Sequence, residues 1–148
     1  MKDEAEPITE DEWLLRRIHH DRFRTDKVPL ISPSAFEPRV KGRDPDTTGI
    51  SLYRADCLAD PLEALATVPA DRRHEFAVVR IPMSLLKRLG LSVHSERDDR
   101  IKGHVVIPEL NANDYKANKT LFTAKQLALT EEASKNENIV LRPRNLDG

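Results

Sequence analysis

Apolar residues along the chain follow patterns that predict several short strands. Residues 50–53 alternate between apolar and polar positions, which indicates a strand with one buried face. Residues 74–81 contain a continuous apolar run, which is typical of a strand covered on both faces. We expect further strands at residues 91–94, 104–107 and 138–141.

A helix is predicted to begin at Asp60. This residue supplies an N-cap carboxylate, Pro61 needs no backbone donor at the first helical position, and Glu63 stands where a capping-box side chain returns to the cap. The helix should stop near Val68, because Pro69 cannot continue it.

Other helices are predicted from similar signals. Residues 84–89 should form a short helix closed by Gly90, and residues 123–133 should form a longer one. Residues 9–12 match a capping box and predict a helical turn. Residues 13–18 fit either a continuation of that turn or a strand.

The mixture of short strands and brief helices predicts an α+β fold, with a compact, mixed or antiparallel sheet and short flanking helices. We expect residues 1–7 to form a mobile acidic tail and residues 8–148 to form a single domain. Residues 25–48 and 111–118 are rich in turn-forming residues and are predicted to be irregular.

Composition and charge narrow the class of protein. The chain has 148 residues, and 24 Lys and Arg against 25 Asp and Glu give a formal charge of −1, so no bulk field favours nucleic acid or an acidic membrane. The single cysteine, Cys57, excludes an internal disulfide and a cysteine-based zinc site. No apolar run is long enough to span a membrane, and the N-terminus lacks a signal-peptide apolar region. The expected location is the cytoplasm.

A local basic cluster stands early in the chain and consists of Arg16, Arg17, His19, His20, Arg22 and Arg24. Adjacent histidines point to opposite faces of a strand and lie about 100° apart on a helix, so we expect no metal site at His19 and His20. His20 is instead a candidate for binding a phosphate group.

Three segments, in sequence order, resemble the RES-domain family, the toxins of bacterial toxin–antitoxin pairs. These segments are residues 15–18, residues 52–56 with the following residues 59–68, and residues 76–82, so the resemblance spans residues 13–82. It implies an ADP-ribosyltransferase-like fold and an activity that degrades or uses NAD⁺. The Gly-Gly-Arg-Trp-Asn-like stretch of the family is replaced here by residues 36–39 and a loop.

The family builds its pocket from an Arg, a Tyr and a Glu, and these fall on Arg17, Tyr53 and Glu63. The resemblance implies that Arg17 clamps a pyrophosphate and that Tyr53 stacks on nicotinamide. It also implies that Glu63 stabilises the cationic sugar formed when the nicotinamide bond breaks.

Each of these residues also has a simpler structural interpretation. Glu63 fits a capping-box glutamate, and Tyr53 fits an aromatic residue on a half-buried strand. Arg17 fits a surface arginine that pairs with Glu10 or Asp11.

The leading hypothesis is therefore a toxin-like domain that binds NAD⁺, either an NAD glycohydrolase or an ADP-ribosyltransferase, with an antitoxin as its protein partner. The alternative is a non-catalytic interaction protein, such as an immunity or accessory partner. Residues 34–36 and 49–52 also look like parts of small uncharacterised bacterial proteins. The sequence leaves catalysis, substrate, partner and oligomeric state open.

Overall fold

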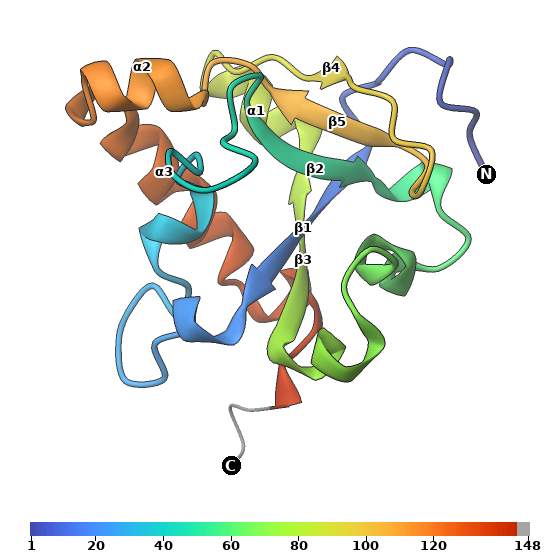
Figure 1. Ribbon diagram of the computed structural model, residues 1–148, viewed down its shortest axis with the longest axis horizontal. Helices are drawn as coiled ribbons and strands as arrows, with labels where there is room; N and C mark the ends of the chain where they lie inside the picture. Colours follow the sequence, from blue (N-terminus) through green and yellow to red (C-terminus); the bar gives the residue numbers. More distant parts are fainter. Residues whose placement is uncertain (145–148) are drawn as a thin grey trace.

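Six strands form one antiparallel sheet in the computed structural model, which describes residues 1–144 (Figure 1). Across the sheet these strands are β4 (His94–Ser95), β5 (His104–Ile107), β2 (Ile50–Arg54), β1 (Trp13–His19), β3 (Phe76–Pro82) and β6 (Ile139–Leu141). Three α-helices accompany them: α1 (Met83–Arg88), α2 (Ala112–Ala117) and α3 (Thr120–Ala133). The predicted α+β class is confirmed, and every strand pair is antiparallel.

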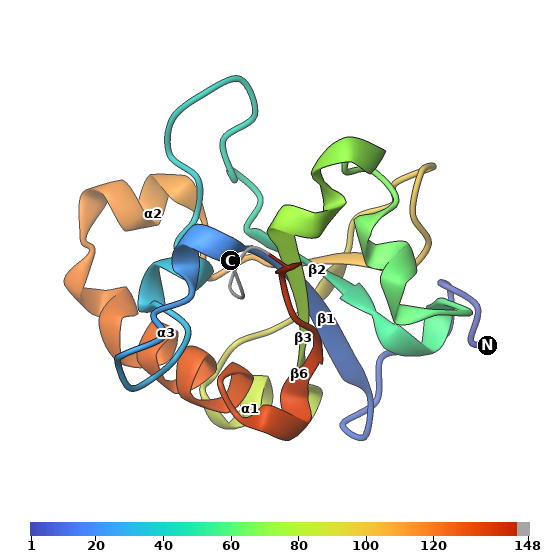
Figure 2. The same ribbon diagram turned by 90° about the horizontal axis from the view of Figure 1, so that it is seen from below.

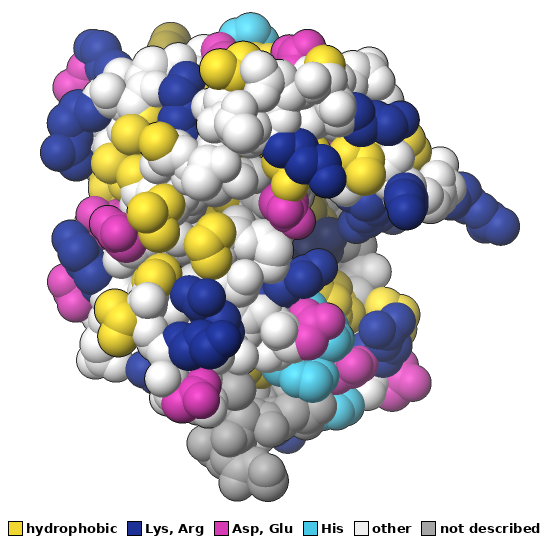
Figure 3. Space-filling view, turned by 90° about the vertical axis from the view of Figure 1, so that its left-hand side faces the viewer, with side chains coloured by type: hydrophobic (Ala, Val, Ile, Leu, Met, Phe, Trp, Pro, Cys, Tyr) yellow, Lys and Arg dark blue, Asp and Glu magenta, His cyan; other side chains and the backbone are white. Residues whose placement is uncertain are grey.

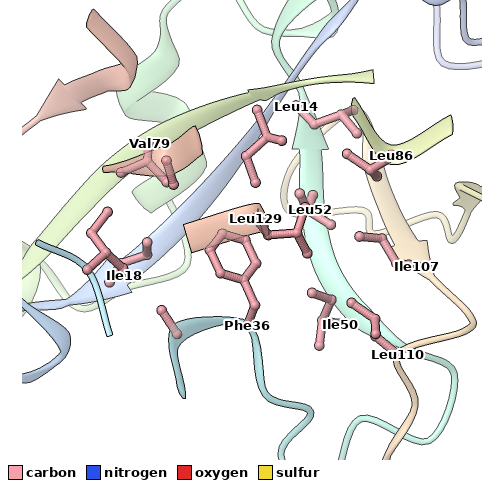
Figure 4. Packing of buried hydrophobic residues seen from close by; sticks show 14 of the residues in the cluster. Leu14, Ile18, Phe36, Ile50, Leu52, Val79, Leu86, Ile107, Leu110 and Leu129 are labelled. Carbon is pink, nitrogen blue, oxygen red and sulfur yellow. The ribbon is translucent and has the colours of Figure 1, made fainter. Parts of the chain in front are cut away.

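The sheet is covered on both faces. The three α-helices lie on one side, and the 3₁₀ turn η4 (Pro61–Leu65) lies on the other (Figure 2). On the helical side, Phe36 and Leu129 pack among side chains of β1, β2 and β3 (Figure 4). A smaller apolar cluster on the opposite side joins Leu15 and Val78 to Leu65 of η4.

The continuous apolar run of β3 follows from this double cover. Ala77 and Val79 belong to the helical-side cluster, while Val78 belongs to the smaller cluster, and all three are fully buried. Phe76 is only half-buried at the start of the strand. The prediction of an internal strand with both faces covered is thus confirmed.

The sheet divides between β1 and β2. These strands share only two register pairs, Leu14 with Arg54 and Leu15 with Tyr53, whereas β1 pairs with β3 over its whole length. Figure 1 shows β2 and β5 curving away from β1 and β3 beyond this junction.

Arg16 fills the gap that opens between the two halves of the sheet. Its Nε donates to the carbonyl of Ala35 at 2.9 Å, and its Nη1 donates to the carbonyl of Ser51 at 2.8 Å. Burial lowers the pKa of Arg16 to about 10, which still leaves the guanidinium charged at neutral pH. The side chain replaces part of the missing strand ladder and holds the split open.

A buried ion pair fastens the closed end of the same junction. Arg54 donates from Nε to Glu12 Oε1 at 2.9 Å and from Nη2 to Glu12 Oε2 at 3.0 Å, and both residues are inaccessible to solvent. The remaining donors of Arg54 reach the carbonyls of Glu4, Glu6 and Pro7. Residues 1–7, which we expected to be a mobile tail, are therefore bound through their backbone.

Two helix predictions are corrected by the structure. The helical turn expected at residues 9–12 is a simple turn, because Glu12 accepts from the backbone N–H of Thr9 at 2.8 Å while the chain continues directly into β1. Residues 13–18 are accordingly a strand. The helix expected after Asp60 is the short 3₁₀ turn η4, and Leu62 on it is 49% exposed.

Elsewhere the local signals were more reliable. Helix α1 ends before Gly90, which adopts a left-handed conformation with φ of 73°. Helix α3 covers residues 123–133 and begins one turn earlier than expected. The strand expected at residues 91–94 is reduced to His94–Ser95. Residues 111–118, predicted to be irregular, form α2 instead.

No helix among the described residues is both long enough and apolar enough to cross a membrane.

Removing one partner of the buried ion pair should strongly destabilise the protein. Arg54→Met removes the two shortest charged contacts of the buried Glu12 carboxylate and leaves it only the Thr9 N–H and the longer contact to Lys2, so we expect the free energy of unfolding to fall by about 3–5 kcal/mol. Urea denaturation measures this change. The exposed pair between Lys87 and Glu10 provides a control, because Lys87→Ala should change stability by less than about 1 kcal/mol. Equal effects of the two substitutions would contradict the anchoring role.

The same pair predicts a dependence of stability on pH. Burial alone would raise the pKa of Glu12, but hydrogen bonds from Arg54 and from the Thr9 N–H outweigh burial and hold the pKa below its usual value. Stability from a depressed carboxyl pKa is present above the unfolded value, about 4.3, and is lost as the pH falls through the folded value. Glu12→Gln should be less stable than the wild type at neutral pH, and urea denaturation at several pH values should show this difference in unfolding free energy shrinking as the pH falls below about 4. A difference in unfolding free energy between Glu12→Gln and the wild type that stays constant with pH would contradict this assignment.

Candidate functional site

Arg17 and Tyr53 lie side by side on the face of the sheet opposite the helices, where β1 and β2 separate. The guanidinium carbon of Arg17 is 5.5 Å from the centre of the Tyr53 ring. Arg17 also donates to the hydroxyl of Thr67 and, at 3.5 Å, to the carbonyl of Ala64. These contacts place two residues predicted from the sequence in one site.

Within residues 1–144, no carboxylate lies within ion-pair distance of Arg17. The alternative of a surface arginine paired with Glu10 or Asp11 is therefore wrong. Glu10 pairs with Lys87, and Asp11 accepts from the hydroxyl of Thr9. The charge of Arg17 is left for another partner.

Tyr53 is too enclosed to offer a stacking surface. Only 4% of the residue is exposed, and its ring contacts Arg17 and the ring of His104, whose centre is 5.4 Å away. Burial raises the pKa of Tyr53, so the hydroxyl stays protonated at neutral pH and can donate a hydrogen bond. The geometry favours the half-buried strand interpretation, with the ring positioning Arg17 rather than stacking on nicotinamide.

Ser51 and His104 form an oriented hydrogen-bonded pair beside Tyr53. His104 Nδ1 contacts the carbonyl of Glu96, and His104 Nε2 lies 2.9 Å from the hydroxyl oxygen of Ser51. A carbonyl only accepts, so Nδ1 carries the proton, and in a neutral ring Nε2 accepts from the Ser51 hydroxyl. This arrangement can take up a proton at His104 Nε2.

These side chains open into an acidic cleft of about 680 Å³. Its lining includes Arg17, Ser51, Tyr53, Thr67 and His104. Five acidic residues also line it, against four arginines; the acids are Asp44, Asp46, Glu96, Asp98 and Asp99. The size is that of a small-molecule site.

A basic groove of about 400 Å³ adjoins the acidic cleft. Arg17, Arg39 and Asp46 line both depressions. The charged residues of the groove are Arg16, Arg17, Arg22, Arg39 and Lys41, against Glu37 and Asp46. Figure 3 shows Lys and Arg side chains around a hollow on this side of the molecule. The groove thus carries a clear excess of positive charge, whereas the cleft has one more acid than arginine, and Arg17 lies at the boundary between them.

Asp98 is the carboxylate most firmly held in the acidic cleft. Its two oxygens accept from Arg100 Nε at 3.1 Å and Nη2 at 3.0 Å. Hydrogen bonds from the Arg100 side chain and backbone hold the pKa of Asp98 below its usual value. The group is therefore ionised at neutral pH and fixed in orientation.

Glu63 does not join this site. It is exposed on η4 and is not among the residues that line the cleft or the groove. Asp60 is the predicted N-cap, since its carboxylate accepts from the Leu62 N–H at 2.9 Å, but Glu63 on the turn that it caps lies outside both linings. His20 also lies outside both linings and contacts His19 instead.

Sequence reasoning missed Ser51, His104 and Asp98 as site residues. One signal was present, because Ser51 and Tyr53 are two apart on a strand and must share a face. His104 faces Tyr53 only through the β2–β5 register, which the sequence did not reveal. Asp98 lies in a charged loop whose path depends on that pairing.

No family model, curated protein or solved structure matches the chain. The resemblance to the RES-domain family therefore remains an expectation from the sequence.

Gly49, at the entrance to β2, should be intolerant of any side chain. It has φ of 125°, and a Cβ there would lie 2.2 Å from the carbonyl oxygen of Ile107 on the paired strand. Gly49→Ala must displace backbone at the wall of the acidic cleft, and we expect a loss of roughly 1–3 kcal/mol beyond the strain of the positive φ. Gly42→Ala is the control, because Gly42 has φ of 96° and open space around it. Thermal and urea unfolding of both variants tests this, and equal losses would contradict it.

Proposed function

We propose that this protein binds NAD⁺ or a closely related nucleotide where the basic groove meets the acidic cleft. The observation that carries the proposal is Arg17, a charged side chain held at that boundary by Thr67 and by the ring of Tyr53. A guanidinium held in this way can still present donors to a phosphate oxygen.

The change of charge along the surface supports a dinucleotide in particular. A pyrophosphate is anionic and suits the groove, whose Arg and Lys residues outnumber its acids. The oxidised nicotinamide ring is cationic, and its ribose carries hydroxyl donors, so both suit the acidic cleft. Arg17 would then contact the pyrophosphate, with the nicotinamide riboside beyond Tyr53.

Within this proposal, Asp98 replaces Glu63 as the carboxylate of the reaction. Breaking the bond between nicotinamide and ribose leaves positive charge on the sugar, and a fixed ionised carboxylate stabilises that charge. Asp98 is fixed by Arg100 in the cleft, whereas Glu63 is exposed outside it. His104 can accept a proton from an attacking water or hydroxyl group.

Calorimetry with NAD⁺ tests the binding step. The wild type should bind saturably, and Arg17→Ala should weaken binding by about 10- to 150-fold, the equivalent of about 1.5–3 kcal/mol for a hydrogen bond to a charged group. Arg88→Ala is the matched control, because Arg88 is an exposed arginine at the end of α1, on the other face of the sheet.

A further variant separates binding from structural effects. Thr67→Val removes the hydroxyl that Arg17 binds but keeps the charge, so NAD⁺ affinity should fall far less than in Arg17→Ala. Thermal melts should show all three variants folded. No binding heat at millimolar NAD⁺, or equal loss in Arg88→Ala, would end the proposal and leave the non-catalytic interaction protein as the better hypothesis.

The chemical step is tested by release of nicotinamide from bound NAD⁺. We expect Asp98→Asn to slow release by about 100-fold, the effect of removing one oriented electrostatic contact to a transition state. Glu63→Gln should behave as the wild type. Slow nicotinamide release by Glu63→Gln, with wild-type release by Asp98→Asn, would assign the reaction to Glu63 instead of Asp98.

A further inference from the structure

His19 and His20 come together in the folded chain, contrary to the expectation for adjacent residues. Strand β1 ends at His19, and the chain turns at once into the 3₁₀ turn η1 (His20–Arg22), so the strand rule no longer separates the two side chains. Their ring centres are 4.4 Å apart. The His19 ring also packs edge-on against Phe76, which fixes its plane.

Glu75 reaches the same place from the end of the 3₁₀ turn η5 (Ala70–Glu75), directly before β3. The antiparallel register sets His19 opposite Phe76, so the residue before Phe76 lies next to the residue after His19. One ligand atom from each of His19, His20 and Glu75 lies within 4.8 Å of the other two, and all three residues are half-buried. Figure 3 shows histidine and acidic side chains gathered below the hollow of the basic groove.

His19 stands between two carboxylates. Its Nδ1 is 2.9 Å from Asp21 Oδ1, and its Nε2 is 3.3 Å from Glu75 Oε1. The backbone nitrogen of Asp21 is farther from Nδ1, at 3.4 Å, so the carboxylate contact governs that nitrogen. A neutral imidazole donates from one nitrogen only. With the proton on Nδ1, the lone pair of Nε2 faces the Glu75 carboxylate, and a cation between them, either a second ring proton or a metal ion, satisfies both groups. His20 brings a third ligand atom to the same point, which favours the metal ion.

We infer that a divalent transition-metal ion of the zinc class supplies that charge, with His19 Nε2, His20 and Glu75 as its ligands. Two imidazoles and one carboxylate are a ligand set that Zn²⁺ accepts with a fourth position left open. Ligand atoms around tetrahedral zinc lie about 3.4 Å apart when the bonds are about 2.1 Å, so small side-chain rotations suffice.

The surroundings fit a metal ligand set. Asp21 accepts from the far nitrogen of His19, which is the usual outer contact that orients a metal-bound histidine. Arg72 Nε binds Glu75 Oε2 at 3.0 Å and leaves Oε1 turned toward His19. His19 also lines the basic groove, so one proposed ligand lies at the edge of that groove.

Zinc titration of the chain without an affinity tag or nucleotide tests the inference, and it does so independently of NAD⁺ binding. We expect one Zn²⁺ per chain by calorimetry. His20→Ala and Glu75→Gln should each weaken binding at least tenfold, and Asp21→Asn should weaken it by about 10- to 100-fold through the outer contact. Substitution by Co²⁺ should give the strong visible absorption of a four-coordinate site.

His94→Ala is the control, because His94 is an exposed histidine on the edge strand β4. It should change zinc affinity by less than about twofold if His19, His20 and Glu75 are the ligands. Thermal melts without metal establish that the variants fold, and His20→Ala avoids the packing of His19 on Phe76. Absence of stoichiometric zinc, or equal weakening by His94→Ala and His20→Ala, would overturn the site.

Discussion

The contact between Arg54 and Glu12 decides how the two halves of the sheet meet. It sits at the end of β2 and directly before β1, beside the register pair of Leu14 with Arg54. A buried charge pair is stable only when its geometry is good and its remaining donors are satisfied, and here a forked contact and backbone carbonyls meet both needs. The junction of β1 and β2 is thereby fixed at one end, so the strands can separate at the other without losing register.

The separation creates the surface on which the groove and the cleft lie. A continuous ladder between β1 and β2 would bring Ser51 against Arg17 and leave no opening. Arg16 prevents this by spanning the gap to the carbonyls of Ala35 and Ser51. The next residue, Arg17, points to the opposite face and reaches the boundary of groove and cleft. Two consecutive arginines thus have different positions, one bound to backbone carbonyls in the gap and one at the boundary of groove and cleft.

Much of the fold was predictable because its signals are local. The apolar run of β3 predicts a buried strand, and the glycine after α1 predicts the end of that helix, without knowledge of distant residues. Where one signal fits two structures, prediction was wrong or incomplete. Asn111 caps α2 by accepting from the Asp114 N–H at 2.9 Å, yet the same residues are typical of loops. An N-cap such as Asp60 begins a 3₁₀ turn as readily as an α-helix.

The site was predictable only in part, for a related reason. Arg17 and Tyr53 share one face of adjacent strands. Because side chains alternate between the two faces of a strand, this shared face can be predicted from the sequence. His104, Asp98 and Glu75 enter through pairing between distant segments, which no local pattern specifies. The rule for neighbouring histidines assumed a continuing element, and β1 ends between them.

Arg54 binds the N-terminal segment through groups that do not depend on the side chains of the bound residues. Arg54 holds residues 4, 6 and 7 solely through their carbonyl oxygens, which every amino acid possesses. Substitution of Glu4 or Glu6 leaves these acceptors in place, whereas a change in the length of the segment moves them away from Arg54. A segment with the composition of a disordered tail can be ordered in this way, because the carbonyl oxygens that Arg54 binds are present whatever the side chains are.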